Sequence, residues 1–355
     1  MAKRIILACS ILNYGGVGKI IGFVASSLRF SDYDITVLSL REENRPSFLP
    51  EEITFASLNT NKTCFWRLRE IVELRRLLKS FLPLTICSFG SEPSVIVRIA
   101  SIGLKKIKVV SAERSDPYSL PTVWKYLSSW AYRNSNYCVF QLEKQRDFYG
   151  ERVKNKSFVI PNPYIPHIGS SAILEKKKTI VSAGRFVYQK GYDTLIRAFA
   201  IVVSKHPDYV LELYGGGEEK EKYETIIHEL KIEGSVKLYN YNRDISSVIA
   251  GCSVFVLSSR FEGIPNVLIE AMSLGVPTVA TDCTPGGPSF LTNCGENGLL
   301  VPVDDVNAMS LAICSIIDSP SLSSQLSKAG KKVCEKLDAK IISRKWKELF
   351  DLIMY

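Results

Sequence analysis

The chain has 355 residues, of which 46% are hydrophobic and 23% charged, and it carries a formal net charge of +9. This composition excludes a disordered or collagen-like chain, and no apolar run reaches the roughly eighteen residues that a membrane-spanning helix needs. A single hydrophobic core rarely grows to this length, so we expect two domains.

The first half of the chain alternates short buried apolar runs with helical apolar repeats, which predicts a parallel, doubly wound sheet. The expected strands lie near residues 4–10, 35–40, 53–58, 84–89, 107–112, 136–140 and 156–160. The expected helices lie near residues 17–29, 65–82, 93–103, 119–133 and 143–149.

A proline-rich segment, Pro161-Asn-Pro-Tyr-Ile-Pro166, interrupts this alternation, which then restarts. The expected strands of the second half lie near residues 179–184, 209–214, 235–239, 253–257, 277–280 and 298–301. The expected helices lie near residues 192–204, 218–231, 244–250, 266–274, 305–317 and 321–335, followed by a terminal helix near 341–354. The fold class is therefore α/β, with two Rossmann-like domains over residues 1–165 and 166–338 that leave a cleft between them.

Positive charge is concentrated in the first domain. Residues 1–165 contain 24 Lys and Arg against 14 Asp and Glu, a balance of +10, so the remainder of the chain carries −1. This asymmetry predicts an anionic neighbour for the first domain, such as a membrane surface or a pyrophosphate-linked lipid. No nucleic-acid motif with interleaved aromatic residues is present, so we predict no nucleic-acid partner.

The expected helix over residues 65–82 is basic and amphipathic, with five Lys and Arg side chains among its apolar positions. A helix of this kind either lies on an anionic lipid surface or packs on its own sheet with a solvated basic face. The nine cysteines include no C-x-x-C pair, which indicates reduced thiols in a cytoplasmic protein.

A strand, a turn and a helix are expected around Arg260-Phe-Glu-Gly-Ile-Pro-Asn-Val-Leu-Ile-Glu-Ala-Met272. The first turn of that helix offers backbone N–H groups to a phosphate. Glu262 lies in the turn, and Glu270 lies among apolar residues of the helix. A carboxylate facing inward at Glu270 would need donors such as the hydroxyls of a ribose, whereas a carboxylate facing outward would simply be solvated.

A second cluster, Gly184-Arg-Phe-Val-Tyr-Gln-Lys-Gly191, also follows a strand and precedes a helix. The guanidinium of Arg185 and the ammonium of Lys190 can together hold a diphosphate and stabilise its growing negative charge. The alternative is that both are solvated loop cations. The glycine turn Gly15-Gly-Val-Gly18 either brings backbone close to a ligand or packs the first helix tightly on its strand. Gly215-Gly-Gly217 is a glycine turn between a strand and an acidic helix start.

The spacing of Glu262 and Glu270, with Gly-Ile-Pro-Asn after the first, resembles the signature of family 4 of the retaining glycosyltransferases, which have the GT-B fold. The run from Gly184 to Gly191 resembles the Gly-Arg, four residues, Lys-Gly motif of the same family. The resemblance covers nearly the whole chain. The proline-rich link is similar to the family's hinge, and residues 339–355 are expected to form a helix that crosses back to the first domain.

The resemblance implies roles for individual residues. Arg185, Lys190 and Glu262 are implied to be catalytic, the two cations stabilising the leaving group and Glu262 lying at the donor sugar, and Glu270 is implied to hold the ribose. The implied donor-binding residues are Gly15, Gly16, Gly184, Arg185, Lys190, Gly215, Glu262, Gly263, Ile264, Pro265, Asn266 and Glu270.

Val110-Ser-Ala-Glu-Arg-Ser-Asp-Pro117 resembles members that extend lipid-pyrophosphate-linked glycans of bacterial surfaces. Glu113 is then expected to orient an acceptor hydroxyl and Arg114 to bind an acceptor phosphate or sugar. The alternative is a salt bridge within the loop.

These features predict a metal-independent retaining glycosyltransferase that moves a sugar from a nucleotide donor, expected to be a UDP-sugar, onto a polyprenyl-pyrophosphate-linked saccharide or another envelope glycan. No metal and no cofactor besides this co-substrate are expected, and Asp32-Tyr-Asp34, the one Asp-x-Asp, lies on the amino side of the sheet. We expect a cytoplasmic location, including the cytoplasmic face of the inner membrane. Two alternatives stay open, a sugar-nucleotide epimerase of the same fold and a non-catalytic nucleotide-sugar-binding module.

Overall fold

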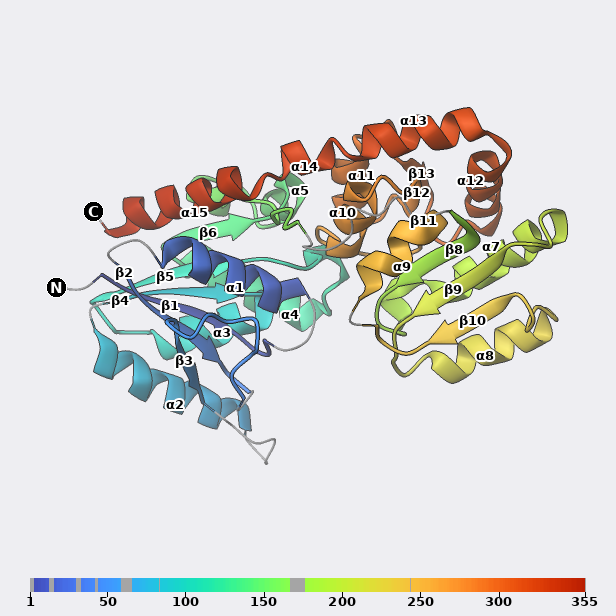
Figure 1. The fold of residues 1–355 in the computed structure, drawn as a ribbon. Helices are drawn as coiled ribbons and strands as arrows, with labels where there is room; N and C mark the ends of the chain where they lie inside the picture. Colours follow the sequence, from blue (N-terminus) through green and yellow to red (C-terminus); the bar gives the residue numbers. More distant parts are fainter. Residues whose placement is uncertain are drawn as a thin grey trace. The chain divides into compact units, whose positions relative to one another are not determined.

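A computed structural model of the protein describes residues 3–12, 16–29, 33–41, 44–58, 66–82, 84–166, 176–242 and 244–354. The chain divides into two compact units (Figure 1). The first consists of Met1–Pro163 together with Ala339–Tyr355, and the second of Tyr164–Asp338. Each unit is built on one parallel β-sheet with helices packed against it.

The sheet of the first unit has seven strands in the order β3-β2-β1-β4-β5-β6-β7. They are β1 (Lys3–Cys9), β2 (Tyr33–Ser39), β3 (Thr54–Ser57), β4 (Leu84–Phe89), β5 (Ile107–Ala112), β6 (Tyr137–Phe140) and β7 (Ser157–Val159). Each neighbouring pair is parallel. The central strand β1 is buried from Ile5 to Cys9, as expected for a parallel strand that is covered on both faces.

Two hydrophobic cores lie on the two faces of this sheet. Successive side chains of β1 point to opposite faces, so Ile5 and Leu7 enter one core while Ile6 and Ala8 enter the other. The helices are α1 (Gly16–Leu28), α2 (Trp66–Phe81), α3 (Ser91–Ala100), α4 (Thr122–Asn134), α5 (Glu143–Phe148), α6 (Glu151–Lys154) and α15 (Ala339–Met354). The first core contains side chains of α1 and α15, and the second contains side chains of α2 and α3.

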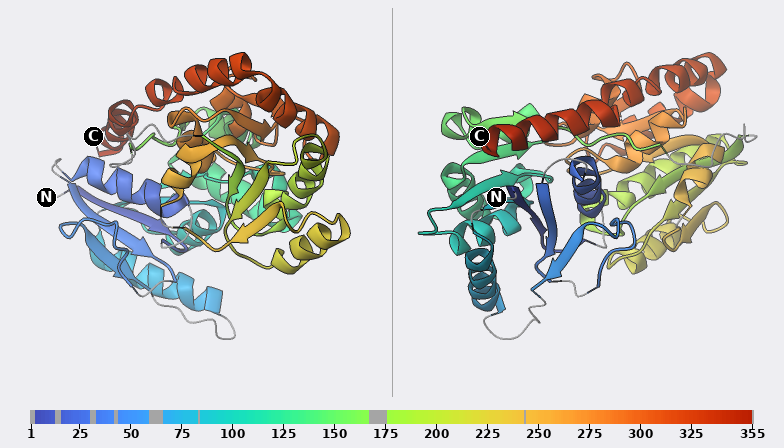
Figure 2. Two further views of the ribbon diagram at one scale, coloured as in Figure 1. Left: turned by 45° about the vertical axis from the view of Figure 1, so that its right-hand side comes forward. Right: turned by 60° about the vertical axis from the view of Figure 1, so that its left-hand side comes forward.

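The last helix, α15, packs on the first unit although the whole second unit precedes it in the chain. Figure 2 shows α15 beside α1, and the two helices are in contact. Its apolar face repeats every three or four residues, as in a helix that covers a core. Trp346 on this face is buried, with its ring centroid 5.7 Å from that of Phe89 at the end of β4.

The sheet of the second unit has six parallel strands in the order β10-β9-β8-β11-β12-β13. They are β8 (Lys177–Ala183), β9 (Val210–Tyr214), β10 (Val236–Tyr239), β11 (Cys252–Leu257), β12 (Thr278–Thr281) and β13 (Leu299–Val301). The helices are α7 (Tyr192–Lys205), α8 (Lys220–Glu229), α9 (Ile245–Gly251), α10 (Asn266–Ser273), α11 (Gly287–Thr292), α12 (Val306–Asp318), α13 (Pro320–Gly330) and α14 (Val333–Lys336). Side chains of α7, α8 and α12 share one core with the strands, while α9 and α10 contact β11 and each other.

The elements follow the predicted order with small differences. The single helix predicted over residues 321–335 is two helices, α13 and α14, separated by a turn at Lys331 and Lys332. The short helices α6 and α11 were not predicted. The start of α11 lies in a Pro-Gly-Gly-Pro run, a composition typical of loops.

Candidate active site

The loops that follow β8 and β11 lie where the strand order of the second sheet reverses. The two strands are neighbours, but the chain passes from β8 to β9 on one side and from β11 to β12 on the other. Doubly wound sheets bind their ligands at this position, outside the carboxyl ends of the strands. Residues 184–191 and 258–265, which contain most of the predicted donor contacts, therefore meet where a ligand is expected.

Hydrogen bonds join these two loops directly. The backbone N–H of Arg260 donates to the carbonyl of Gln189 at 2.8 Å, and the Gln189 side-chain amide donates to the carbonyl of Phe261 at 2.9 Å. The hydroxyl of Ser258 donates to the carbonyl of Lys190 at 2.8 Å. Because backbone groups on both sides are used, the two loops behave as one structural element.

Close backbone contacts explain several glycines of the site. A Cβ atom on Gly215 would lie 1.9 Å from the carbonyl oxygen of Gly184, and one on Gly287 would lie 1.6 Å from that of Gly263. No side chain fits at such distances, so glycine is needed at Gly215 and Gly287 for the turns to pack against one another. Gly184 and Gly215, predicted to lie at the donor, thus pack against each other, and Gly263 packs against Gly287 at the same edge of the sheet.

Lys190 and Glu262 form an ion pair between the two loops. Lys190 Nζ lies 2.5 Å from Glu262 Oε1, and the hydroxyl of Ser259 donates to the same oxygen at 3.1 Å. The Lys190 and Glu262 side chains are 14% and 12% exposed, so the pair is partly desolvated and yet within reach of a ligand. Partial desolvation strengthens the attraction between the two charges relative to an open surface pair.

Arg185, the third residue implied to be catalytic, is exposed at the start of the first loop. Its Nη2 donates to the side-chain oxygen of Gln189 at 3.4 Å. Within the described ranges, Arg185 makes no ion pair with a carboxylate. Its guanidinium fork is therefore available for an anionic ligand.

Helix α10 begins directly after the second loop. Its N-cap residue is Pro265, which supplies no side-chain hydrogen bond to the first turn. The first-turn N–H groups and the positive end of the helix dipole favour a negative charge at this position. Ile264 and Pro265 are buried and Asn266 is half-buried, so these residues would contact a ligand chiefly through backbone atoms.

Glu270 is half-buried on α10, and its carboxylate faces α9. Its Oε1 accepts a hydrogen bond from the hydroxyl of Ser246 in the first turn of α9. The structure thus favours the inward-facing alternative over a fully solvated carboxylate. A serine hydroxyl provides the kind of donor that a ribose hydroxyl would provide.

Arg260 was not assigned a role from the sequence, yet it anchors the two loops. Its guanidinium lies 3.0 Å from Asp193 Oδ2 and 2.9 Å from Asp304 Oδ1, and it stacks 4.2 Å from the ring centroid of Tyr188. Burial disfavours the charged form, but the two carboxylates outweigh this effect and raise the pKa of Arg260. The only sequence signal was an arginine next to the Phe-Glu-Gly turn, because Asp193 and Asp304 are distant in the chain.

In the first unit, Glu113 is completely buried at the end of β5, and its carboxylate accepts hydrogen bonds from six donors. These donors are the hydroxyls of Ser91, Ser115, Tyr132 and Tyr149 and the backbone N–H groups of Arg114 and Ser115. Burial, together with the Glu113 charge, raises the pKa of Tyr132 and Tyr149 well above its ordinary value and keeps both hydroxyls protonated. This arrangement argues against the predicted contact with an acceptor hydroxyl and gives Glu113 a structural role.

Arg114 is also buried, and its guanidinium lies 5.5 Å and 5.2 Å from the ring centroids of Phe89 and Trp346. Its Nη1 donates to the carbonyl of Ile160 at 3.2 Å. Burial lowers the pKa of Arg114 to about 10, so the group stays charged at neutral pH. The alternative was a salt bridge within the loop; between Glu113 and Arg114 the contact is instead a hydrogen bond from the backbone N–H of Arg114 to the Glu113 carboxylate at 2.9 Å.

The remaining predicted contacts are the glycines of the first loop. Gly15 lies outside the described residues, and Gly16 is exposed at the start of α1. In the described part of the chain, no group of His, Cys, Asp and Glu side chains is placed to hold a metal ion. None of the helices within the same ranges is long and apolar enough to cross a bilayer.

Comparison with known proteins places this site in a family. Residues 166–333 match the family model described as "Glycosyl transferases group 1". A Haemophilus influenzae protein named "Uncharacterized glycosyltransferase" is 28% identical over 94% of this chain and 95% of its own length. The "GalNAc-alpha-(1->4)-GalNAc-alpha-(1->3)-diNAcBac-PP-undecaprenol alpha-1,4-N-acetyl-D-galactosaminyltransferase" of Campylobacter jejuni is 22% identical over 95% of each chain.

Solved structures share the fold at low sequence identity. HepE from Anabaena, in complex with UDP and glucose, has a TM-score of 0.83 at 18% identity, covering 98% of this chain and 99% of its own. This likeness confirms the predicted GT-B fold of two Rossmann-like domains. The chain is therefore a glycosyltransferase, and its second unit is a domain of the glycosyl transferases group 1 family.

Proposed function

We propose that this glycosyltransferase moves a sugar, a hexose or N-acetylhexosamine, from a UDP donor onto a polyprenyl-pyrophosphate-linked saccharide or another envelope glycan, with retention of configuration and without a metal. The observation that carries the proposal is the pair of joined loops at the strand reversal of the second sheet. These loops place Lys190 against Glu262, with Arg185 in the same loop and the start of α10 directly after them.

The diphosphate of the donor is the group that this site suits best. Arg185 offers a guanidinium fork, Lys190 an ammonium, and the first turn of α10 offers backbone N–H groups. Negative charge grows on the diphosphate as the sugar leaves, and fixed donors that point at this charge lower the barrier. Two cations and a helix N-terminus supply this stabilisation without a divalent metal.

The two glutamates suit the sugars on either side of the diphosphate. Glu262 lies next to Gly263 in the second loop, and its carboxylate would accept hydrogen bonds from the transferred sugar. Glu270 would exchange its bond to Ser246 for bonds to the ribose hydroxyls. Charge-assisted hydrogen bonds of this kind are about twice as strong as neutral ones.

The transfer itself needs no pair of catalytic carboxylates of the kind that hydrolases use. The bond between the anomeric carbon and the β-phosphate oxygen breaks, and the acceptor oxygen forms its bond to that carbon on the same face. The acceptor proton passes to a β-phosphate oxygen, so UDP is both the leaving group and the base. Lys190 and Arg185 hold the negative charge during this step.

The donor and acceptor classes are supported by relatives and by charge. The Campylobacter jejuni relative is named for an undecaprenol-linked substrate, and the HepE structure contains UDP. The excess of positive charge in residues 1–165 suits an anionic, pyrophosphate-linked acceptor. The same charge suits a peripheral position on the cytoplasmic face of the inner membrane.

A binding screen followed by a transfer assay tests this proposal. The melting temperature of the purified full-length protein is measured in the presence of each member of a panel of UDP- and GDP-sugars. The true donor should raise this temperature, because a ligand that binds only the folded state stabilises it. Glu262→Gln should abolish transfer of the sugar to a polyprenyl-pyrophosphate-linked acceptor, measured as UDP released, while largely sparing nucleotide binding. Glu229→Gln, an exposed carboxylate at the end of α8, is the matched control.

Other outcomes would replace the proposal. Unchanged turnover in Glu262→Gln would show that Glu262 is not needed for transfer and would rule out the proposed active site. An isomerised nucleotide sugar formed without acceptor would indicate an epimerase. Nucleotide binding without release of UDP for any acceptor would indicate a binding module.

A further inference from the structure

Helix α4 exposes an apolar and aromatic face. Val123, Tyr126, Leu127 and Trp130, which we call the α4 stripe, are 67%, 74%, 38% and 38% exposed. Their spacing of three, one and three residues places them on one side of the helix. In a soluble domain, a stripe with this spacing normally faces the core, so its exposure calls for a partner.

The inner face of the same helix fixes this orientation. Ser128, Ala131 and Tyr132 are the buried residues of α4, and Tyr132 donates its hydroxyl to Glu113 at 3.2 Å. Helix α4 also packs along α3. Because the buried face is held by these contacts, the α4 stripe cannot turn inward without breaking the hydrogen bond between Tyr132 and Glu113.

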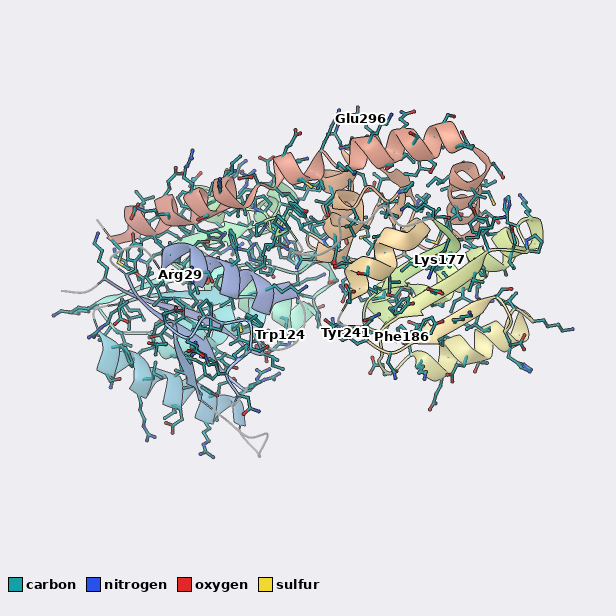
Figure 3. All side chains as sticks on the ribbon, in the orientation of Figure 1. Arg29, Trp124, Lys177, Phe186, Tyr241 and Glu296 are labelled. Atoms are coloured by element: carbon teal, nitrogen blue, oxygen red, sulfur yellow. The ribbon has the colours of Figure 1, made fainter. Side chains whose placement is uncertain are left out.

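Basic side chains lie on α4 and at the neighbouring start of α2, where Arg67 also pairs with Glu92 at 3.5 Å. The helix contains no acidic residue; Arg133 is exposed beside the stripe, whereas Lys125 is half-buried on the opposite side of the helix. Its first turn meets the start of α2, where the guanidinium of Arg67 lies 5.3 Å from the ring centroid of Trp124, a residue labelled in Figure 3. Further exposed cations of α2 are Arg69, Arg76 and Lys79.

We propose that the α4 stripe inserts into the interfacial layer of an anionic bilayer while the cations of α2 contact the lipid headgroups. Tyrosine and tryptophan are the side chains that concentrate at the membrane–water interface. A helix with an apolar face beside basic residues lies in the plane of that interface and is held by buried area and by attraction to anionic lipid. The inference deepens the proposed function, since a polyprenyl-linked acceptor has to be reached at a membrane surface.

A second copy of the chain is a poorer occupant of the same face. Residues 1–165 carry a balance of +10, so two such faces would bring like charges together. A single helical stripe also offers little area compared with the roughly 800 Å² per partner of a stable interface. An anionic lipid surface satisfies the charge and the apolar stripe together.

Vesicle co-sedimentation of the full-length protein tests the inference without relying on transfer. We expect binding to vesicles that contain phosphatidylglycerol, weaker binding to phosphatidylcholine alone, and a loss of binding as salt is raised. The double variant Val123→Glu, Tyr126→Glu should bind the anionic vesicles at least about tenfold more weakly, because two apolar groups no longer enter the interface. Leu311→Glu, at an apolar side chain of α12 in the second unit that is 62% exposed, is the control and should bind like the wild type.

Two further measurements separate this inference from others. Brominated lipids should quench tryptophan fluorescence in the wild type and much less in Trp130→Phe. The thermal shift with UDP-sugar should be the same in the double variant as in the wild type, so a failed donor assignment and a failed membrane surface give different results.

The inference is overturned if the double variant binds anionic vesicles as tightly as the wild type, or if the wild type binds none. It is also overturned if light scattering shows a dimer that the double variant converts to a monomer, because the α4 stripe would then be a protein interface.

Discussion

Lys190 Nζ lies 2.5 Å from Glu262 Oε1 although 72 residues separate them in the chain. The contact forms because β8 and β11 are adjacent strands, so the loops at their carboxyl ends meet. In the free protein, Glu262 is the counter-ion of Lys190. A bound diphosphate offers Lys190 a second anion, which leaves Glu262 oxygens for the sugar.

Removing the ammonium tests this exchange. In Lys190→Ala, we expect kcat to fall about 10²- to 10³-fold, the usual loss when one group that stabilises developing charge is removed. Steady-state release of UDP measures the effect. Lys220→Ala, at a surface residue of α8 that pairs with Glu224 at 3.7 Å, should be neutral, and equal losses in both variants would refute the role of Lys190.

Glu270 should control affinity for the ribose. In Glu270→Ala, UDP binding should weaken about 10- to 100-fold, because charge-assisted hydrogen bonds contribute about 1.5–3 kcal/mol. Isothermal titration calorimetry measures the change. Ser246→Ala is the informative control, since it removes the hydroxyl that holds Glu270 in the free protein and should leave affinity equal or slightly higher. Wild-type affinity in Glu270→Ala would exclude the ribose contact.

We expect Arg260 to stabilise the folded second unit rather than to take part in the transfer step. Arg260→Ala leaves Asp193 and Asp304 without their shared cation and should lower the free energy of unfolding of the second unit by about 2–4 kcal/mol. Urea unfolding followed by circular dichroism measures this, with the exposed Arg197→Ala as control. A variant as stable as the wild type would contradict the anchoring role.

The same ion pair predicts a pH dependence. Burial of Asp193 opposes its ionisation, but Arg260, together with the charge of Lys222, outweighs this and lowers the pKa of Asp193 below its ordinary value. A carboxyl group whose pKa is lower in the folded than in the unfolded state stabilises the folded protein at pH values above its unfolded-state pKa. This stabilisation is lost as the pH falls through its folded-state pKa. The stability difference between wild type and Arg260→Ala should therefore shrink below about pH 4. A difference that stays constant through this acidic range would exclude the ion pair as its cause.

Glu113 should matter for folding rather than for the acceptor. Glu113→Gln places amide hydrogens against hydroxyl donors and should destabilise the first unit by about 3–5 kcal/mol, while the folded fraction keeps its transfer rate. Tyr149→Phe removes one donor and should cost about 1–2 kcal/mol. Calorimetry and transfer assays on the same samples separate the effects. Lost transfer at wild-type stability would restore an acceptor role for Glu113.

Chelation tests metal independence. If Arg185, Lys190 and the start of α10 carry the diphosphate charge, EDTA should leave turnover unchanged and added Mg²⁺ or Mn²⁺ should not raise it. Loss of activity with EDTA and its recovery with Mn²⁺ would contradict the proposed chemistry.

Much of the fold and the donor loops could be predicted from the sequence because the determinants are local. The strands are short buried runs with turns between them, and in a parallel sheet the loop after each strand lies at the carboxyl edge. This places Arg185, Lys190 and Glu262 at one edge, but the 2.5 Å contact between Lys190 and Glu262 depends on which strands are neighbours.

Features that depend on distant partners could not be predicted. Arg260 meets Asp193 and Asp304, which belong to the start of α7 and to the segment before α12. Glu113 is buried because hydroxyls from α3, α4 and the segment after α5 converge on it. A short stretch of sequence does not show which distant residues will meet in the fold, so these contacts could not be predicted.

Hydrogen–deuterium exchange with and without UDP tests the donor site most directly, since it needs no substitution. UDP should slow exchange at the backbone amides of residues 185–191, 215–217 and 263–268, which include most of the first joined loop, the end of the second and the first turn of α10. Unchanged exchange in these three segments, with protection appearing elsewhere in the chain, would contradict this prediction.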